Sequence, residues 1–384
     1  MLEASLLAAC GALGILTVVC IYPLILLLLP CRTPPAAPPT PSAWPTVTII
    51  TAARNAAALL EAKIQNFREL DYPSECLILL VASDASTDAT RSIIEAAGDP
   101  RIQLVEQAAR RGKAAAMNLA VEQAGADLLL FSDADALLAP DAVRKLAPHF
   151  SDPQVGGVCG LRMSARSAAR LRDAQQTYIN LDSALKRIES ARGRISSNDG
   201  KIHMIRRMLF SPIPPDVTDD LYTALSVVSQ GYRFLFEPEA VAEVKVPSRD
   251  ALHEIQRRRR IVTRSLTGIF RMRRVLNPAR FGWFSIGLLI NKVGRRLLPF
   301  FLLMLSGGLL GVVLASSALT KWTLVAAVIL LVVFIIRPAR LNKPLALAQY
   351  MLAGFIGSGW GVIDFLSGRR VSVWEPRKTE EVGA

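Results

Sequence analysis

Apolar residues gather near both ends of the chain and leave a stretch of ordinary soluble composition between them. Residues 5–29 contain no charged side chain, and this run is long enough to cross a bilayer core of about 30 Å. Only Glu3 precedes the run and no basic segment does, so it is more typical of a retained anchor than of a cleaved signal peptide. Further apolar segments occupy 297–316, 322–336 and 344–366. The pattern therefore predicts an anchor, a globular domain and a C-terminal membrane block.

Strand-like and helix-like patterns alternate between residues 46 and 135. Strands are predicted at 46–50, 76–83, 101–105 and 127–135, and helices at 57–70, 87–98 and 112–125. Continuous apolar strands separated by helices are typical of a parallel α/β sheet with helices on both faces. Such sheets bind ligands beyond the carboxyl ends of their strands, where this sequence has Arg54, Asp84, Asp133 and Asp135. We expect these side chains to converge on one crevice.

After residue 150 the alternation is looser. Strands are predicted at 155–160, 201–205, 232–236 and 241–246, and helices at 169–193 and 219–231. A run rich in arginine follows from residue 256 to residue 274 and leads to the membrane block. The predicted division is an anchor (1–30), a Pro-rich linker (31–45), a globular domain (46–275), an interfacial segment (276–296), a membrane block (297–366) and a polar tail (367–384).

Composition limits the possible chemistry. The chain is 51% hydrophobic with a mean hydropathy of +0.33, which excludes a disordered chain. Five cysteines without a CxxC pair and only three histidines exclude a disulfide framework, a Cys/His zinc site and an iron–sulfur cluster. Acidic chemistry must therefore come from carboxylates. The net charge of +13 is concentrated in arginines beside the membrane block, which indicates membrane lipids rather than nucleic acid as a partner.

Two strand ends carry candidate ligand-binding carboxylates. Asp133 and Asp135 follow a buried strand at a spacing that lets both face one divalent cation, and Mg²⁺ or Mn²⁺ suits them because these ions also bind phosphate oxygens. The alternative is a turn whose aspartates cap the next helix. Asp84, at the tip of the second strand, can accept an N–H from a pyrimidine ring, whereas Asp88 is placed as a helix cap.

Two helix starts carry the other candidates. Lys113 lies at a helix N-terminus, where free N–H groups and the helix dipole suit an anionic diphosphate. The alternative is a solvated basic loop. Asp219 and Asp220 open the helix at 219–231, so one can cap the helix while the other acts as a general base.

In this order, the segments resemble family-2 glycosyltransferases, the inverting nucleotide-sugar enzymes with a GT-A fold. The resemblance covers about residues 45–275 and rests on four passages: TIITAARN (48–55), VASDASTDAT (81–90), 110–136 and 216–247. It implies an α/β catalytic domain with a Rossmann-like mixed sheet, flanked by transmembrane helices. It also implies that Asp220 is the catalytic base with Asp219 beside it, because Gly231 follows Asp220 at the family's spacing. The remaining roles it implies are Asp133 and Asp135 for Mg²⁺ or Mn²⁺, and Arg54, Asp84, Lys113, Asp133, Gln256, Arg259 and Arg260 for the donor.

The membrane-embedded branch of that family resembles this chain most, namely the synthases of cellulose, hyaluronan and poly-N-acetylglucosamine. Those enzymes carry Gln-x-x-Arg-Trp before their membrane helices. This chain offers Gln256 with Arg259, or Arg257 with Arg260, and no Trp follows either pair. The missing Trp argues against processive synthesis and favours transfer to a lipid-linked acceptor.

The expected function is that of a membrane-bound inverting glycosyltransferase with its catalytic domain in the cytoplasm, as the arginine run indicates. The expected donor is a nucleotide-diphosphate sugar, with UDP favoured over GDP, and the expected acceptor is a lipid or a glycan. The alternatives are a processive polysaccharide synthase and a non-catalytic membrane scaffold with a decayed transferase domain. Retention of the four aspartates at 84, 133, 135 and 220 argues against the scaffold.

Overall fold

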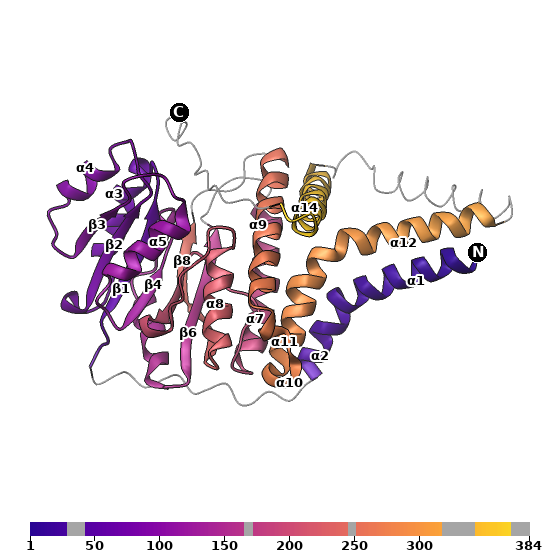
Figure 1. The fold of residues 1–384 in the computed structure, drawn as a ribbon, viewed down its shortest axis with the longest axis horizontal. Coiled ribbons are helices and arrows are strands. Elements are labelled where there is room, and N and C mark those ends of the chain that lie inside the picture. Colours follow the sequence, from indigo (N-terminus) through magenta and orange to yellow (C-terminus); the bar gives the residue numbers. More distant parts are fainter. Residues whose placement is uncertain (29–42, 165–171, 245–250, 317–341, 370–384) are drawn as a thin grey trace.

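The computed structural model describes residues 1–28, 43–164, 172–244, 251–316 and 342–369. A mixed eight-stranded sheet forms the centre of the globular domain, on the left in Figure 1. Its strand order is β3-β2-β1-β4-β7-β6-β8-β5. The strands are β1 (Val47–Ala53), β2 (Leu77–Ser83), β3 (Ile102–Glu106), β4 (Leu128–Phe131), β5 (Ala136–Leu138), β6 (Val155–Ser164), β7 (His203–Arg206) and β8 (Arg233–Val244). β1 pairs in parallel with β2 and β4, and β2 with β3, which confirms the parallel half expected from the alternation. β7 and β5 pair antiparallel with their neighbours, which makes the sheet mixed.

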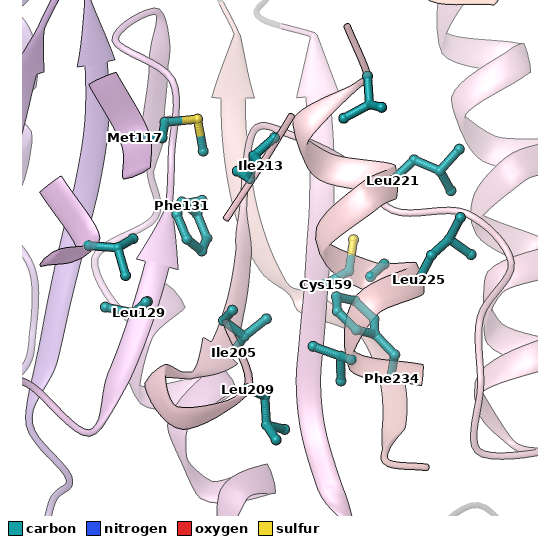
Figure 2. Close-up of a cluster of buried hydrophobic side chains, with 14 of the residues drawn as sticks. Met117, Leu129, Phe131, Cys159, Ile205, Leu209, Ile213, Leu221, Leu225 and Phe234 are labelled. Atoms are coloured by element: carbon teal, nitrogen blue, oxygen red, sulfur yellow. The ribbon is translucent and has the colours of Figure 1, made fainter. Parts of the chain in front are cut away.

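Helices cover both faces of the sheet and bury an apolar core against each. Because successive side chains of a strand point to opposite faces, β4 gives Phe131 to one core and Leu130 to the other. In the first core Met117 packs beside Phe131, and Leu221 lies on the other side of the same cluster (Figure 2). Leu60 packs in the second core. The helices of this domain are α3 (Ala57–Arg68), α4 (Thr90–Ala96), α5 (Lys113–Gln123), α6 (Ala142–Leu146), α7 (Arg172–Ser190) and α8 (Asp219–Ser229).

β8 is one strand where two, 232–236 and 241–246, were expected. Pro238 lies between the two apolar runs and has no N–H to donate to a ladder. The parallel pairing of β8 with β6 nevertheless continues on both sides of it through a register shift. Within that shift Gly160 alone lies opposite residues 237–240, so the proline sits in a bulge and leaves the ladder intact around it.

The strand expected at 127–135 is shorter in the structure. β4 ends at Phe131, and residues 132–135 leave the ladder before β5 begins at Ala136. The two aspartates of this stretch therefore lie in a loop at the carboxyl end of β4, where they can face a ligand.

Two helical runs are long and apolar enough to cross a membrane, Leu2–Leu28 and Trp283–Ala315. The first consists of α1 (Leu2–Leu16), a π-helical segment and α2 (Tyr22–Leu28), and the second of α11 (Trp283–Gly287), a π-helical segment (Leu288–Gly294) and α12 (Arg295–Ala315). α1 and α12 lie side by side and project away from the sheet (Figure 1). Their backbones approach closely, because a Cβ added to Gly308 would clash with the backbone of Ala8.

The expected boundary between an interfacial segment (276–296) and the membrane block falls inside the second run, which has no break at residue 296. The polar residues of this stretch hold the helix to the globular domain. Asn291 donates to Ser196 Oγ at 3.0 Å, and Lys292 donates to Ser197 Oγ at 2.6 Å. The globular domain and the second apolar helix are therefore joined by direct hydrogen bonds.

The two remaining long helices, α9 (Ala251–Arg271) and α14 (Asn342–Leu366), pack against each other (Figure 1). Gly357 and Gly361 of α14 face the backbone of α9, where a Cβ would come within 2.6 Å of Ile255 O and 2.7 Å of Arg259 O. Between α9 and α11, the chain forms a short 3-10 turn (Arg273–Leu276) and α10 (Pro278–Phe281). The expected span at 322–336, most of the linker and most of the polar tail lie outside the described residues.

Candidate active site

Side chains from four segments meet beyond the end of β4 and form a chain of alternating charge. Lys113 Nζ, at the start of α5, lies 2.8 Å from Asp133 Oδ1 and 2.7 Å from Asp219 Oδ2. Lys201 Nζ, just before β7, lies 2.9 Å from Asp133 Oδ2 and 2.6 Å from Asp135 Oδ1. We call these five residues the carboxylate–lysine cluster. The structure thus brings together four residues that the sequence assigned to one site and adds Lys201, which the sequence did not single out.

Neighbouring charges keep the cluster ionised. Burial by itself would raise the pKa of Asp133, but Lys113 and Lys201 outweigh burial and hold that pKa far below its usual range. Burial by itself would lower the pKa of Lys113, but Asp133 and Asp219 outweigh it and raise that pKa. The pKa of Asp219 is also lowered, because Lys113 outweighs the effect of burial. Three carboxylates against two ammonium groups leave the cluster attractive to a further cation.

Asp220 differs from Asp219 although the two are adjacent. Burial, followed by the nearby charge of Asp219, raises the pKa of Asp220 from 3.8 to about 6. Its Oδ1 accepts a hydrogen bond from Leu221 N at 2.7 Å, and its backbone oxygen accepts one from Asn198 Nδ2 at 2.9 Å. A carboxylate with a pKa close to neutral and no lysine within an ion-pair distance among the described contacts suits a general base.

Neither of these two acids is the N-cap residue of α8, as one of them was expected to be. The N-cap residue is Thr218, and its side chain makes no capping hydrogen bond. Asp220 Oδ1 accepts from Leu221 N within the first turn, but from a position inside the helix. Asp219 is the first residue of the helix, and its carboxylate binds the Lys113 ammonium group instead. The pair links the start of α8 to the start of α5, so Asp219 positions the lysine.

The turns after β1 and β2 form a second part of the site. Asp84 is fully buried, and its Oδ1 accepts hydrogen bonds from Arg111 N at 2.8 Å and Gly112 N at 2.9 Å. Its Oδ2 is buried without a hydrogen-bond partner, and such an acceptor costs about 1–3 kcal/mol until a donor reaches it. Arg54 Nη1 donates to the backbone oxygens of Asp84 and Ala85 at 2.6 and 3.1 Å. Arg54 therefore holds the backbone of the turn that carries Asp84.

The same turns contain two non-glycine residues in the left-handed region of the backbone. Asn55 has a φ of 48° and Ala85 has a φ of 52°. The Asn55 side chain compensates by accepting a hydrogen bond from Thr87 N at 2.9 Å, which ties the two turns together. Alanine has no such compensation, and strain of this kind persists where the surroundings require the conformation.

The cluster fits a divalent cation that arrives with a phosphate ligand. Asp133 Oδ2 and Asp135 Oδ1 converge on one ammonium nitrogen, so both oxygens already face a single cationic position. Among the described residues there is no group of three or more His, Cys, Asp or Glu that could hold a metal by itself. Mg²⁺ commonly binds through one or two carboxylates together with substrate phosphates and water, and the two aspartates match that donor set.

Two buried side chains near the cluster were not singled out from the sequence. Lys63 Nζ donates to Ser132 Oγ at 2.8 Å and to Ala136 O at 2.7 Å, so it brackets the loop that carries the two aspartates. Burial lowers the pKa of Lys63 to about 7. The sequence did indicate that Lys63 is buried, because this lysine lies on the apolar face of its helix, next to Ile64. His203 is fully buried against the Phe131 ring, and burial lowers the pKa of His203 to about 4.

Of the three donor-site candidates on α9, Arg259 contacts α14. Arg259 Nη2 lies 2.7 Å from Asp364 Oδ1 of α14, and its guanidinium lies 5.3 Å from the Trp360 ring. Gln256 is exposed and Arg260 is partly buried on the same helix. The structure therefore directs Arg259 to α14 rather than to the cluster.

Arg264, one turn further along α9, contacts the loop just before the start of α8. It is buried, and its Nε and Nη2 donate to Val217 O at 2.8 and 2.6 Å. Arg264 belongs to the arginine-rich run at 256–274 that the sequence places beside the membrane block. Its position next to Thr218 ties α9 to the loop before Asp219 and Asp220.

The comparisons with known proteins agree with this geometry. Residues 48–213 match the family described as glycosyl transferase family 2. These residues are a family-2 glycosyltransferase domain. The chain is 30% identical over 239 residues to an N-acetylglucosaminyltransferase of Mesorhizobium japonicum, covering 57% of this chain and 56% of that protein. It is 25% identical over 208 residues to a poly-beta-1,6-N-acetyl-D-glucosamine synthase of Staphylococcus aureus, covering 52% and 50%. The chain thus spans about half the length of these curated relatives.

One solved structure shares nearly the whole fold. It is a mannosyltransferase from Pyrobaculum calidifontis in complex with GDP-Man and Mn²⁺, with a TM-score of 0.71 and 24% identity. The match covers 94% of this chain and 99% of that one, so it includes the helices outside the sheet. This likeness establishes the GT-A fold that the sequence resemblance implied.

Proposed function

We propose that this protein is an inverting glycosyltransferase that moves a sugar from a nucleotide-diphosphate sugar to a lipid or polysaccharide acceptor at the cytoplasmic face of a membrane. The observation that carries the proposal is the convergence of Lys113, Asp133 and Asp219–Asp220, three distant segments of the chain, within a family-2 domain. A decayed scaffold would have no need to keep Lys113, Asp133 and Asp219 ion-paired in a partly buried place, whereas a transferase needs a cation and a base there.

Each group has a role that follows from its surroundings. Lys113 would approach the diphosphate from the start of α5, where free backbone N–H groups also suit an anion. Asp133 and Asp135 would hold Mg²⁺ or Mn²⁺, which neutralises charge on the departing nucleotide. Asp84 would accept an N–H from the nucleobase at its unpartnered Oδ2. Asp220 would remove the proton of the acceptor hydroxyl as that oxygen attacks the anomeric carbon.

We favour a UDP-sugar as the donor, and N-acetylglucosamine as the first sugar to test. The support for this sugar is that relatives from two bacterial genera, at 25–30% identity, are named for it. The solved mannosyltransferase, which binds GDP-Man, makes a GDP-sugar the second donor to test.

Residence in a membrane is also part of the proposal. Two apolar helical runs have the length that a span requires, and their closely packed small residues are typical of helix pairs in lipid. Nucleotide sugars are cytoplasmic, and the arginines of α9 and of the turn that follows it agree with a domain on that side. The bacterial inner membrane is the location that we propose.

The test is nucleotide release by the full-length protein purified in detergent. UDP-GlcNAc, other UDP-sugars and GDP-Man are supplied with Mn²⁺, with and without a lipid extract or a short glycan. We expect release of UDP that depends on an acceptor and on Asp220. No nucleotide release from any donor, in a protein that still binds nucleotide, would overturn the proposed activity.

A further inference from the structure

Lys201 occupies the position toward which both proposed metal ligands point. Its Nζ lies 2.9 Å from Asp133 Oδ2 and 2.6 Å from Asp135 Oδ1, and its side chain is only 19% exposed. These two oxygens have no nearer cation among the described contacts, since Lys113 binds the other oxygen of Asp133. The lysine therefore neutralises the pair of carboxylates from inside the protein.

A divalent cation and this ammonium group exclude each other. Mg²⁺ binds carboxylate oxygens at about 2.0–2.1 Å, which is closer than the ammonium nitrogen now lies to the same atoms. Two cations bound to the same oxygens would be separated by only a few ångströms, and like charges at that distance repel strongly in a partly buried site. The metal can bind both aspartates only after Lys201 has moved away.

We propose that Lys201 is a resident counterion that competes with the divalent metal, so that the metal affinity of the free protein is set by the cost of displacing this lysine. The inference rests on the metal role proposed above for Asp133 and Asp135. Lys113 is placed differently, because it also binds Asp219 and would keep a partner after the metal arrives. Both ion pairs described for Lys201 are with the oxygens that would bind the metal, so this lysine would lose both pairs when the metal binds.

The donor changes this balance. A nucleotide diphosphate brings phosphate oxygens that can accept the displaced Lys201 ammonium and complete the coordination of the metal at the same time. Metal and nucleotide should therefore bind cooperatively, and by linkage each raises the affinity for the other by the same factor. Without Lys201 the metal has no competitor, so that part of the cooperativity disappears.

The experiment measures Mn²⁺ binding directly, from the electron paramagnetic resonance signal of free Mn²⁺, on full-length protein in detergent. The variants are Lys201→Met and Lys201→Gln, which remove the charge, and Lys201→Arg, which keeps it. Lys145→Met is the matched control, because Lys145 pairs with Asp141 and Glu239 and contacts neither metal ligand. Without nucleotide, we expect both uncharged variants to bind Mn²⁺ at least about tenfold more tightly than the wild type, and the other two variants to bind like it.

Addition of UDP provides the second measurement. UDP should increase the Mn²⁺ affinity of the wild type by a larger factor than that of Lys201→Met. Thermal unfolding provides the third. In EDTA, Lys201→Met should unfold at a lower temperature than the wild type, because Asp133 and Asp135 lose their cation. Addition of Mn²⁺ should raise the unfolding temperature of Lys201→Met by more than it raises that of the wild type. A purely structural lysine would lower the unfolding temperature equally in EDTA and in Mn²⁺.

The outcomes separate this inference from the proposed function. Unchanged or weaker Mn²⁺ binding by both uncharged variants overturns the competition, even if the wild type is an active transferase. Failure of both variants to fold with or without Mn²⁺ also overturns it, because Lys201 would then be indispensable rather than displaceable. Tighter Mn²⁺ binding in a protein that transfers no sugar supports the competition while the proposed function fails.

Discussion

Replacement of Asp220 by asparagine should make the protein more stable and far less active. In the folded state burial and Asp219 raise the pKa of Asp220 from 3.8 to about 6, so its charged form is disfavoured at neutral pH. Asparagine has the same shape and carries no charge. Its amide oxygen can keep the hydrogen bond from Leu221 N, but it cannot take a proton from an acceptor.

The size and pH dependence of the stability effect follow from the two pKa values. A difference between 3.8 and about 6, at 1.36 kcal/mol per pH unit, corresponds to about 3 kcal/mol as an upper limit for a partly exposed group. Below pH 3.8 the carboxyl is protonated in both states and the cost is absent. The cost grows as the pH rises toward 6 and is complete above it. The stabilisation by Asp220→Asn should therefore be largest at pH 8 and vanish near pH 4.

Thermal unfolding in EDTA at pH 4, 6 and 8 checks the first half of this prediction. Nucleotide release with Mn²⁺ and a saturating donor checks the second, and we expect a loss of at least about 100-fold, the lower end for removal of a general base. Binding of the donor should stay near normal, because Asp84, Lys113 and Asp133 are unchanged. Wild-type turnover should fall as the pH drops below about 6, where Asp220 takes up a proton.

Two results would refute this reasoning. If Asp220→Asn unfolds at a lower temperature than the wild type at pH 8, the carboxylate is stabilised by a partner and its pKa is not raised. If the variant keeps full turnover while the donor still binds, the base is another group. Loss of turnover in Asp219→Asn alone would move the base by one position along α8.

Three further predictions concern the rest of the site and the membrane helices. Asp219→Asn should weaken UDP binding and lower the unfolding temperature at pH 8, because Lys113 loses a partner at 2.7 Å. Since the pKa of Asp219 is lowered, the drop in unfolding temperature should shrink on acidification. Unchanged UDP binding would contradict the role of the ion pair. Turnover should cease in EDTA, and Asp135→Ala should weaken Mn²⁺ binding; full activity in the chelator would contradict a metal requirement. Alkaline carbonate should leave the protein in the membrane pellet because Leu2–Leu28 and Trp283–Ala315 are strongly apolar, and recovery in the supernatant would contradict two spans.

The parallel half of the sheet could be predicted because its signals are local. Each strand there is a short apolar run, and each helix begins after a polar turn. The start of α5 is an example, where Gly112 has a φ of 92° and precedes Lys113. β8 could not be predicted as one strand, because continuity across Pro238 depends on β6 and on the bulge opposite Gly160.

The acidic residues of the site could also be predicted, and the lysines only in part. Asp133 and Asp135 follow an apolar strand at a recognisable spacing. Lys201 lies 66 positions after Asp135 in a turn that resembles any polar loop, so nothing in the sequence couples the two. The pairing of Asp219 with Lys113 could not be predicted for the same reason. An acid at a helix start usually caps the helix, and only the folded chain shows that Lys113 is within reach.

The tryptophan missing after Arg259 is likewise a local sequence pattern, and the folded chain places another tryptophan beside this arginine. No tryptophan directly follows Arg259 in sequence, yet Trp360 of α14 lies 5.3 Å from the Arg259 guanidinium and keeps 52% of its surface exposed. Asp364, four residues further along α14, binds the same guanidinium. An arginine and a tryptophan can therefore meet on this surface although the motif that would unite them is absent from the sequence. The choice between a lipid and a growing glycan as acceptor must come from the acceptor assay, because absence from a linear motif does not mean absence from the surface.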